Sequence, residues 1–170
     1  LIDQANYEGE GAMRLEDLAR VFFKKNGFAS FPHENYLLDT PDHVWNIDTP
    51  KMLQSLLADL ENGKEKMYIA ARFHHGLVDI IRQAALRAGT RKIAFSGGVF
   101  QNVLLSDMIE NLLSPEFDVF FHQQLSPNDE NISFGQLTLS HFSLSHLSLS
   151  HLSLSHSLPC VSQFPVKSVP

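Results

Sequence analysis

Residues 93–102, which read Ile-Ala-Phe-Ser-Gly-Gly-Val-Phe-Gln-Asn, constrain the fold more than any other stretch. Residues 92–95 have the composition of a buried strand, Ser-Gly-Gly is typical of a tight turn, and residues 99–113 carry apolar side chains at helical spacing. The β-rich segment 117–122 follows. The sequence therefore predicts a strand–helix–strand unit, whose two strands should be parallel and joined by a right-handed connection.

The glycine turn itself, Gly97 and Gly98, is a candidate anion site. Glycines let the backbone approach a ligand closely, and the start of a helix presents unpaired N–H groups and the positive end of the helix dipole. A phosphate fits such a place. Gly-Gly between a strand and a helix is also ordinary turn chemistry, so spacing alone leaves both interpretations open.

Upstream, the pattern predicts three helices and a hairpin. Apolar spacing indicates helices over residues 12–26, ending at Gly27, and 67–88, ending at Gly89. A third helix, with Thr49 as N-cap and Pro50 in its first turn, runs to Gly63. Segments 36–39 and 43–48 favour a β-hairpin.

Two adjacent histidines on the long helix, His74 and His75, suggest a metal site. Neighbouring helical residues point about 100° apart, whereas chelation from a helix requires residues four apart. We therefore expect one of the two histidines to be packed and the other exposed.

Residues 126–136 contain a second turn, Pro127-Asn128-Asp129, before a possible helix. Asp129 is predicted at a loop-to-helix junction beyond the end of a strand, where open α/β sheets place ligands. The alternative is an aspartate that caps the helix.

From Leu137 onward the chain repeats a five-residue Leu/Ser/His unit. On a helix each repeat rotates the leucines by about 140°, and on a strand they change face at every repeat, so no continuous apolar face results. The same geometry scatters His141, His146, His151 and His156, which argues against a metal site. We expect residues 137–170 to form a disordered low-complexity tail, and Cys160 within it to have no catalytic role.

Composition excludes several classes of function. The net charge of −6, without a basic run, argues against nucleic-acid binding. A single cysteine fits a reducing compartment, and no apolar run is long enough to cross a membrane, so we expect a cytoplasmic protein without a membrane partner. Because the chain opens on Leu1 directly before a charged helical pattern, we expect it to be part of something longer.

Four motifs together resemble the C-terminal part of the hydrogenase-maturation carbamoyltransferase family, HypF. They are Tyr7-Glu-Gly, Phe73-His74, Ser-Gly-Gly-Val-Phe-Gln-Asn ending at Asn102, and the segment from Pro127 to Phe-Gly-Gln136. Their order and spacing agree over residues 1–136. The resemblance implies an α/β fold, namely half of a duplicated actin/Hsp70-like ATPase (ASKHA) fold with a mixed sheet flanked by helices.

The resemblance also implies a function. The family makes carbamoyl-adenylate from carbamoyl phosphate and ATP, and passes the carbamoyl group to a C-terminal cysteine of the partner protein HypE, on the way to the cyanide ligands of nickel–iron hydrogenase. In this family Gly97 and Gly98 correspond to residues against the nucleotide phosphate, Asn102 to one in the nucleotide pocket, and Gly9 to one near the ribose. Asp129 corresponds to a ligand of a divalent metal, zinc or iron. No catalytic residue is assigned.

Two departures limit this assignment. Glu130 and Asn131 stand where the family has two glycines, which adds side chains beside a close backbone approach. The family's His-x-x-x-His metal ligands correspond to positions upstream of Leu1, so we expect this chain alone to be inactive. The alternatives are an inactive remnant or protein-interaction module that keeps the fold, and a relative of the tRNA threonylcarbamoyl transferases.

Overall fold

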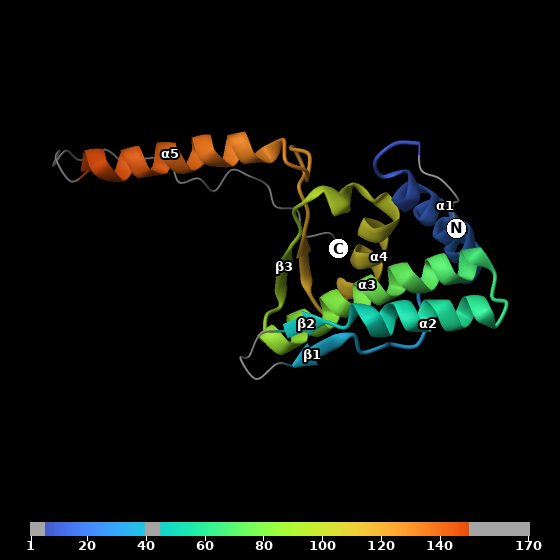
Figure 1. Cartoon of the computed structure of the whole chain (residues 1–170). Coiled ribbons are helices and arrows are strands. Elements are labelled where there is room, and N and C mark those ends of the chain that lie inside the picture. The colour runs from blue at the N-terminus through green and yellow to red at the C-terminus, as the bar shows by residue number, and fades with distance from the viewer. Residues whose placement is uncertain (1–5, 40–44, 150–170) are drawn as a thin grey trace. The chain divides into compact units, whose positions relative to one another are not determined.

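The computed structural model describes residues 6–39 and 45–149, and the chain divides into two compact units. The first unit comprises Leu1–Ile93 and Asn102–Val119, and the second Ala94–Gln101 and Phe120–Pro170. The elements form an α/β protein, as predicted (Figure 1). In chain order they are α1 (Glu10–Asn26), β1 (Leu37–Asp39), β2 (Trp45–Ile47), α2 (Thr49–Glu61), α3 (Lys66–Ala88), β3 (Lys92–Ala94), the 3₁₀ turn η1 (Gly98–Gln101), α4 (Val103–Leu113), β4 (Asp118–Phe120) and α5 (Asn131–Leu149).

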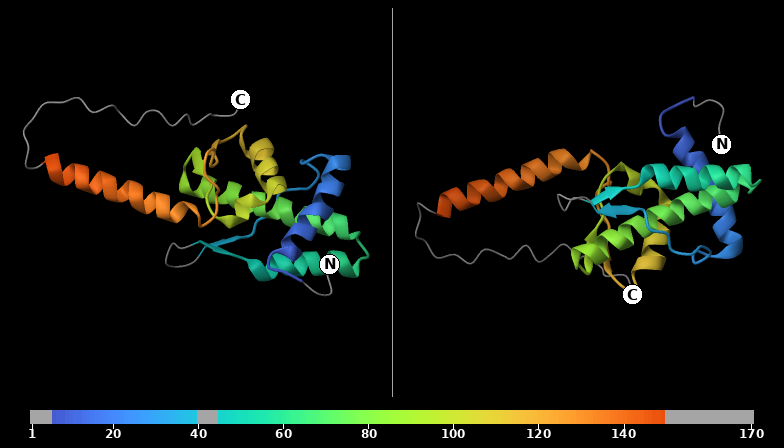
Figure 2. Two further views of the ribbon diagram at one scale, coloured as in Figure 1. Left: turned by 90° about the horizontal axis from the view of Figure 1, so that it is seen from above. Right: turned by 60° about the horizontal axis from the view of Figure 1, so that its bottom comes forward.

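Helix α3 is the centre of the first unit. It contacts α1, α2, α4 and β1, and α2 lies alongside it (Figures 1 and 2). Its first two turns already bury Ala70 and Ala71 completely, so neighbouring helices approach its backbone closely. Gly89 ends the helix in the left-handed conformation with φ of 62°, which confirms the predicted stop.

The predicted hairpin forms, with a short antiparallel register. Leu38 pairs with Asn46, and Asp39 pairs with Trp45, whose side chain is 40% exposed. Helix α2 follows directly, but its N-cap is Asp48 and not Thr49 as predicted. The Asp48 carboxylate accepts from Lys51 N–H at 3.0 Å, and Thr49 is the first helical residue.

The core beneath the hairpin is built around Tyr36. Its ring, 2% exposed, packs with Leu37, Met52 and Ile80. Gly76 on α3 allows this approach, because a Cβ there would lie 3.2 Å from Cε2 of Tyr36 and 3.4 Å from Cε of Met52.

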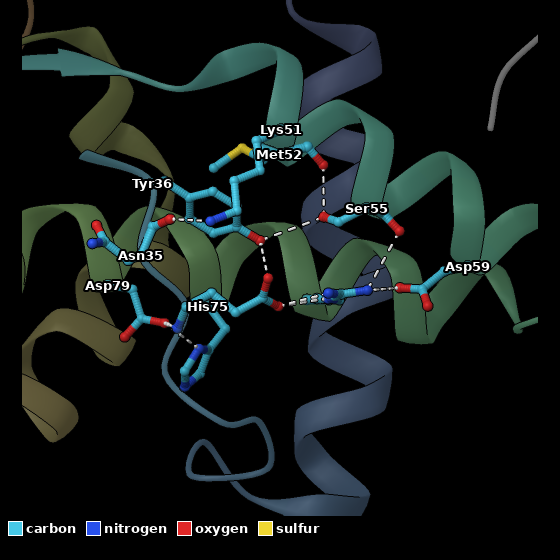
Figure 3. Close-up of polar contacts among 10 residues, drawn as sticks. Asn35, Tyr36, Lys51, Met52, Ser55, Asp59, His75 and Asp79 are labelled. Atoms are coloured by element: carbon cyan, nitrogen blue, oxygen red, sulfur yellow. Dashed lines mark hydrogen bonds and ion pairs between the residues drawn. The ribbon is translucent and has the colours of Figure 1, made fainter. Parts of the chain in front are cut away.

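A polar network ties α2 and α3 to the segment before β1 (Figure 3). The Arg72 guanidinium on α3 donates to Glu34 Oε1 at 2.8 Å and to Asp59 Oδ2, on α2, at 2.5 Å. Tyr36 Oη donates to the other Glu34 oxygen at 2.7 Å and lies 3.4 Å from Ser55 Oγ. Burial lowers the pKa of Arg72, but the bonds to the two carboxylates outweigh it and raise that pKa, so the side chain stays charged.

The strand–helix–strand prediction is confirmed for the two strands and adjusted for the helix. Asp118 N–H donates to Arg91 O at 2.7 Å, and Phe95 N–H donates to Phe120 O at 2.9 Å. The partners advance together along both strands, which is the parallel pattern. The helix predicted from Val99 is interrupted, because η1 occupies residues 98–101 and α4 begins only at Val103, after the N-cap Asn102.

Helix α5 differs from the expectation for the tail. Residues 137–149, predicted to be disordered, continue the helix that begins at Asn131. Leucine is a good helix former, and the Thr138 and Ser140 hydroxyls donate back to the carbonyls of Phe134 and Gln136 within the helix. The expected lack of an apolar face is confirmed by the even spread of apolar residues around α5. Leu137 and Leu139 are 69% and 68% exposed, so neither is buried.

The remaining tail residues, with His151, His156 and Cys160, lie outside the described residues. Among the helices that the structure does describe, none has the length and apolarity needed to span a membrane.

Candidate functional site

In the second unit the two predicted turns meet. Gly97 N–H donates to the carbonyl oxygen of Pro127 at 2.6 Å, which joins Ser-Gly-Gly to Pro-Asn-Asp. Gly97 has a φ of 112°, a conformation that residues with a Cβ rarely adopt. Gly98, the next residue, is exposed and opens η1. The structure therefore brings the candidate phosphate turn and the candidate metal turn together.

His122 reinforces this junction. Its Nε2 lies 3.1 Å from Ser96 Oγ, and its Nδ1 lies 3.4 Å from Asn131 Nδ2. Asn131 also donates to the carbonyl oxygen of Ser126. No sequence motif marks His122, although its place just after β4, at the carboxyl end of a parallel strand, is where α/β folds gather functional side chains.

Aromatic packing supports the same turn. The Phe95 and Phe121 rings stack with centroids 4.8 Å apart, and Phe100 contacts Phe95 edge-on at 5.0 Å. This packing fixes both ends of residues 95–100, so the polar groups of the turn are carried on a rigid base.

Asp129 lies on the exposed side of its turn. The side chain that accepts a backbone hydrogen bond here is that of Asn128, from Glu130 N–H at 3.1 Å, and α5 begins two residues after Asp129. These contacts do not support the interpretation of Asp129 as the helix cap.

In the first unit, Asn102 joins His74. Asn102 Oδ1 accepts from Leu105 N–H at 2.8 Å and so caps α4, while its Nδ2 lies 3.1 Å from His74 Nε2. His74 Nδ1 lies 2.9 Å from the carbonyl oxygen of Ala70, which can only accept. His74 therefore carries its proton on Nδ1, and its Nε2 accepts from Asn102.

Glu16 of α1 completes this arrangement. Its Oε1 accepts from Leu104 N–H at 3.2 Å, so a carboxylate from another helix already satisfies the first turn of α4. Burial lowers the pKa of His74, against the Ala70 hydrogen bond and the charge of Glu16, and this keeps the ring neutral. No local pattern could have predicted Glu16, because its partner is far along the chain.

Gly9, the candidate ribose neighbour, is the N-cap of α1. It is exposed, has a φ of 84°, and its carbonyl accepts from Met13 N–H at 3.0 Å. Gly9 and Asn102 belong to the first unit, whereas Gly97, Gly98 and Asp129 belong to the second.

The expectation that one of His74 and His75 is exposed was wrong. Both are buried, at 1% and 3% exposure, because α3 is covered on several sides. His75 lies 3.4 Å from Asp79, four residues later on α3, and His33 lies 2.5 Å from the other Asp79 oxygen. Burial alone would raise the pKa of Asp79, but the bonds from His75, Glu34 N–H and His33 lower it.

Comparison with known proteins gives this arrangement a family. The model of the family described as "Carbamoyltransferase, Kae1-like Domain, second subdomain" matches residues 1–136. The chain belongs to this carbamoyltransferase family. The resemblance found in the sequence motifs is therefore confirmed.

Curated relatives of this chain are named carbamoyltransferase HypF. The chain is 30% identical over 140 residues to the carbamoyltransferase HypF of Synechocystis sp., which covers 81% of the chain and 17% of the relative. It is 32% identical over 140 residues to the probable carbamoyltransferase HypF of Methanocaldococcus jannaschii, covering 78% and 17%. The chain thus spans about a sixth of the length of these relatives.

Solved structures share the subdomain fold. A crystal structure of full-length HypF in the phosphate- and nucleotide-bound form matches with a TM-score of 0.64 and 29% identity, over 84% of this chain and 18% of that one. The T. kodakarensis HypF structure matches with a TM-score of 0.60 at 24% identity, over 86% and 18%, which shows the fold.

Proposed function

We propose that this subdomain forms one wall of a cleft that binds carbamoyl-adenylate, in an enzyme that transfers the carbamoyl group to the C-terminal cysteine of a HypE-type acceptor during nickel–iron hydrogenase maturation. The chain supplies nucleotide contacts and one metal ligand. The rest of the cleft comes from sequence that aligns with the remaining length of the HypF relatives.

One observation carries the proposal, namely the hydrogen bond from Gly97 to Pro127. It couples the turn that resembles a phosphate-binding loop to the turn that carries Asp129. A phosphate and a metal ion that neutralises it are best bound by groups held in a fixed relation. The match to a HypF structure in a phosphate- and nucleotide-bound form supports a nucleotide as the ligand.

The implied metal fits Asp129 as a single ligand. An exposed carboxylate offers a hard oxygen to zinc or iron, and such an ion would polarise the carbamoyl carbonyl or neutralise phosphate charge. Within the described ranges, no cluster of three or more potential metal ligands includes Asp129. In this proposal the other ligands of the ion come from outside these residues.

Asn102 is a positioning residue in this proposal. Its carboxamide has Oδ1 committed to α4 and Nδ2 to neutral His74, so its orientation is set before a ligand arrives. A nucleotide at this place would meet a fixed amide instead of one that must be ordered on binding.

A second candidate function, a protein-interaction module that keeps the fold but not the chemistry, is favoured by Asn131. This residue replaces a family glycine, and its side chain fills the turn by bonding to Ser126 O and His122. A turn filled in this way leaves less room for a ligand.

A chimeric enzyme separates the two candidates. Residues 1–136 replace the matching segment of Synechocystis HypF, and carbamoylation of the HypE C-terminal cysteine is followed by mass spectrometry with ATP and carbamoyl phosphate. We expect activity in the chimera and at least about a tenfold loss in its Asp129→Asn variant. A folded chimera that binds HypE but never carbamoylates it would support the interaction module and contradict the proposal.

A further inference from the structure

A second group of potential metal ligands lies away from the two turns, in the first unit. It consists of His33, in the segment between α1 and β1, with His75 and Asp79 on α3, and one ligand atom from each lies within 4.8 Å of the others. Figure 3 shows His75 and Asp79 on the same side of α3. They are four residues apart, the spacing that presents two ligands together from a helix.

From this geometry we propose that His33, His75 and Asp79 bind one divalent transition-metal ion of the zinc type. Two imidazoles and a carboxylate form the ligand set that proteins use for zinc and iron(II), with water completing the coordination. This site is separate in sequence and composition from the metal ligand at Asp129.

The burial of two of these ligands and a hydrogen bond that orients the carboxylate favour a metal site over a chance grouping of side chains. His75 and Asp79 are 3% and 2% exposed, so two of the three ligands are held rigidly by the packing of α3. Glu34 N–H donates to Asp79 Oδ2 at 2.9 Å, which orients the carboxylate in the way that metal sites orient their ligands from behind.

There is also space and access. The three side chains line a cavity of about 120 Å³, whereas one water molecule needs about 10–15 Å³ by the same measure. His33 has a side chain 65% exposed and forms the open side. Apolar walls from Phe31, Val78 and Leu113 limit competition from bulk water.

The charges around the cavity are compatible with a cation. Arg82 lines the cavity too, but it forms a two-pronged ion pair with Glu116, at 2.9 and 2.8 Å, which cancels its charge. Asp79 then leaves one negative charge facing the cavity. Ligand atoms on one zinc ion lie about 3.3 Å apart. The distance from His33 Nδ1 to Asp79 Oδ1 is 2.5 Å, so the exposed His33 ring must move away from Asp79 by less than about 1 Å to bind the ion.

The alternative is a purely structural role, in which hydrogen bonds to Asp79 hold residues 33–34 against α3. Such a structural role and a metal site make opposite predictions for added zinc. Zinc stabilises the folded chain only if the folded state binds it, by an amount set by its concentration relative to the dissociation constant.

The full chain, stripped with chelator, is titrated with Zn²⁺ by calorimetry and with Co²⁺ by visible absorption. We expect one tight equivalent, d–d bands of nitrogen- and oxygen-ligated cobalt, and a rise in melting temperature with zinc. His33→Ala, chosen because His33 is exposed and its loss leaves the fold intact, should weaken binding more than about 100-fold and abolish the rise. Asp79→Asn should do the same.

Two controls address other ligands. Replacing the four tail histidines together by glutamine should leave the tight equivalent intact, and so should Asp129→Asn. The proposal is overturned if zinc binding survives His33→Ala, if it disappears with the tail histidines, or if wild type melts at the same temperature with and without zinc. Loss of binding in Asp129→Asn alone would instead assign the ion to the proposed carbamoyl site.

Discussion

Tyr36 holds a phenol inside the first unit, where its hydroxyl donates to Glu34 and lies beside Ser55. Burial raises the pKa of Tyr36, and Glu34 adds to that shift. A folded pKa above the unfolded value, about 10, means that the folded state keeps its proton longer. The stabilisation from the protonated Tyr36 phenol is therefore complete below the unfolded pKa, about 10, and is lost as the pH rises through the higher folded pKa.

We therefore expect chemical denaturation to show stability falling between about pH 9.5 and 11 in wild type, and falling less in Tyr36→Phe. The control is Tyr7→Phe, because Tyr7 is 55% exposed. An equal alkaline loss in wild type and Tyr36→Phe would show that the phenol does not titrate with unfolding.

Arg72 is the cation on which two carboxylates depend, with only 20% of its side chain exposed. Arg72→Met keeps the apolar stem but leaves Glu34 and Asp59 unpaired. We expect the free energy of unfolding to fall by about 2 kcal/mol. This is less than the loss expected on breaking a fully buried ion pair, because all three groups reach solvent. Lys66→Met, an exposed position on the same helix, should change it by less than about 0.5 kcal/mol. Similar effects of the two substitutions in urea denaturation would contradict this account.

At the scale of elements, the contact of α3 with the hairpin core depends on Gly76. The nearest atoms to a side chain at this position are ring and methyl carbons of Tyr36 and Met52, both buried. Gly76→Leu should cost about 2 kcal/mol through overpacking, despite the better helix propensity of leucine. Ala88→Leu, at the exposed end of the same helix, is the matched control and should be close to neutral by thermal unfolding. A stable Gly76→Leu protein would show that α2 can move away from α3.

Helices and strands with strong local signals were predictable. Gly27 and Gly89 end α1 and α3 as expected, and the apolar spacing of α3 gave its length. The predicted helix starts were wrong where two neighbouring residues could each cap the helix. Asp48 and Thr49 are both good caps, and the start of α4 was set by Asn102, whose side chain satisfies the helix and His74 together. The choice of Asn102 depends on a partner distant in sequence, His74, which no local pattern reveals.

The same distinction applies to the candidate site. Gly97 and Asp129 were found because they lie in recognisable turns, and the bond from Gly97 to Pro127 joins them. Whether those residues contact a nucleotide and a metal stays a prediction. The grouping of His33 with His75 and Asp79 was not predictable, because 41 residues that form a hairpin and two helix segments lie between His33 and His75. Only the helical spacing of His75 and Asp79 was visible in the sequence.

For the whole molecule, the repeat region should add helix without adding stability. Leu137 and Leu139 are exposed, and the hydroxyls of Thr138 and Ser140 bond within α5. A chain ending at Gln136 should melt within about 2 °C of the full chain while losing helical ellipticity. The measurement is thermal unfolding followed by circular dichroism. A much lower melting temperature would mean that the repeat covers apolar surface.

Trp45, the chain's one tryptophan, pairs with Asp39 in the hairpin and is 40% exposed. The chain therefore carries a single tryptophan fluorophore, and it lies in β2. Its emission reports the local environment of β2, next to the Tyr36 core. It does not report directly on the other elements, because they contain no tryptophan. If the first unit unfolds cooperatively, the fluorescence transition in denaturant coincides with the loss of helical signal. A fluorescence change that precedes it would reveal a hairpin that opens while the three helices packed on α3 remain assembled.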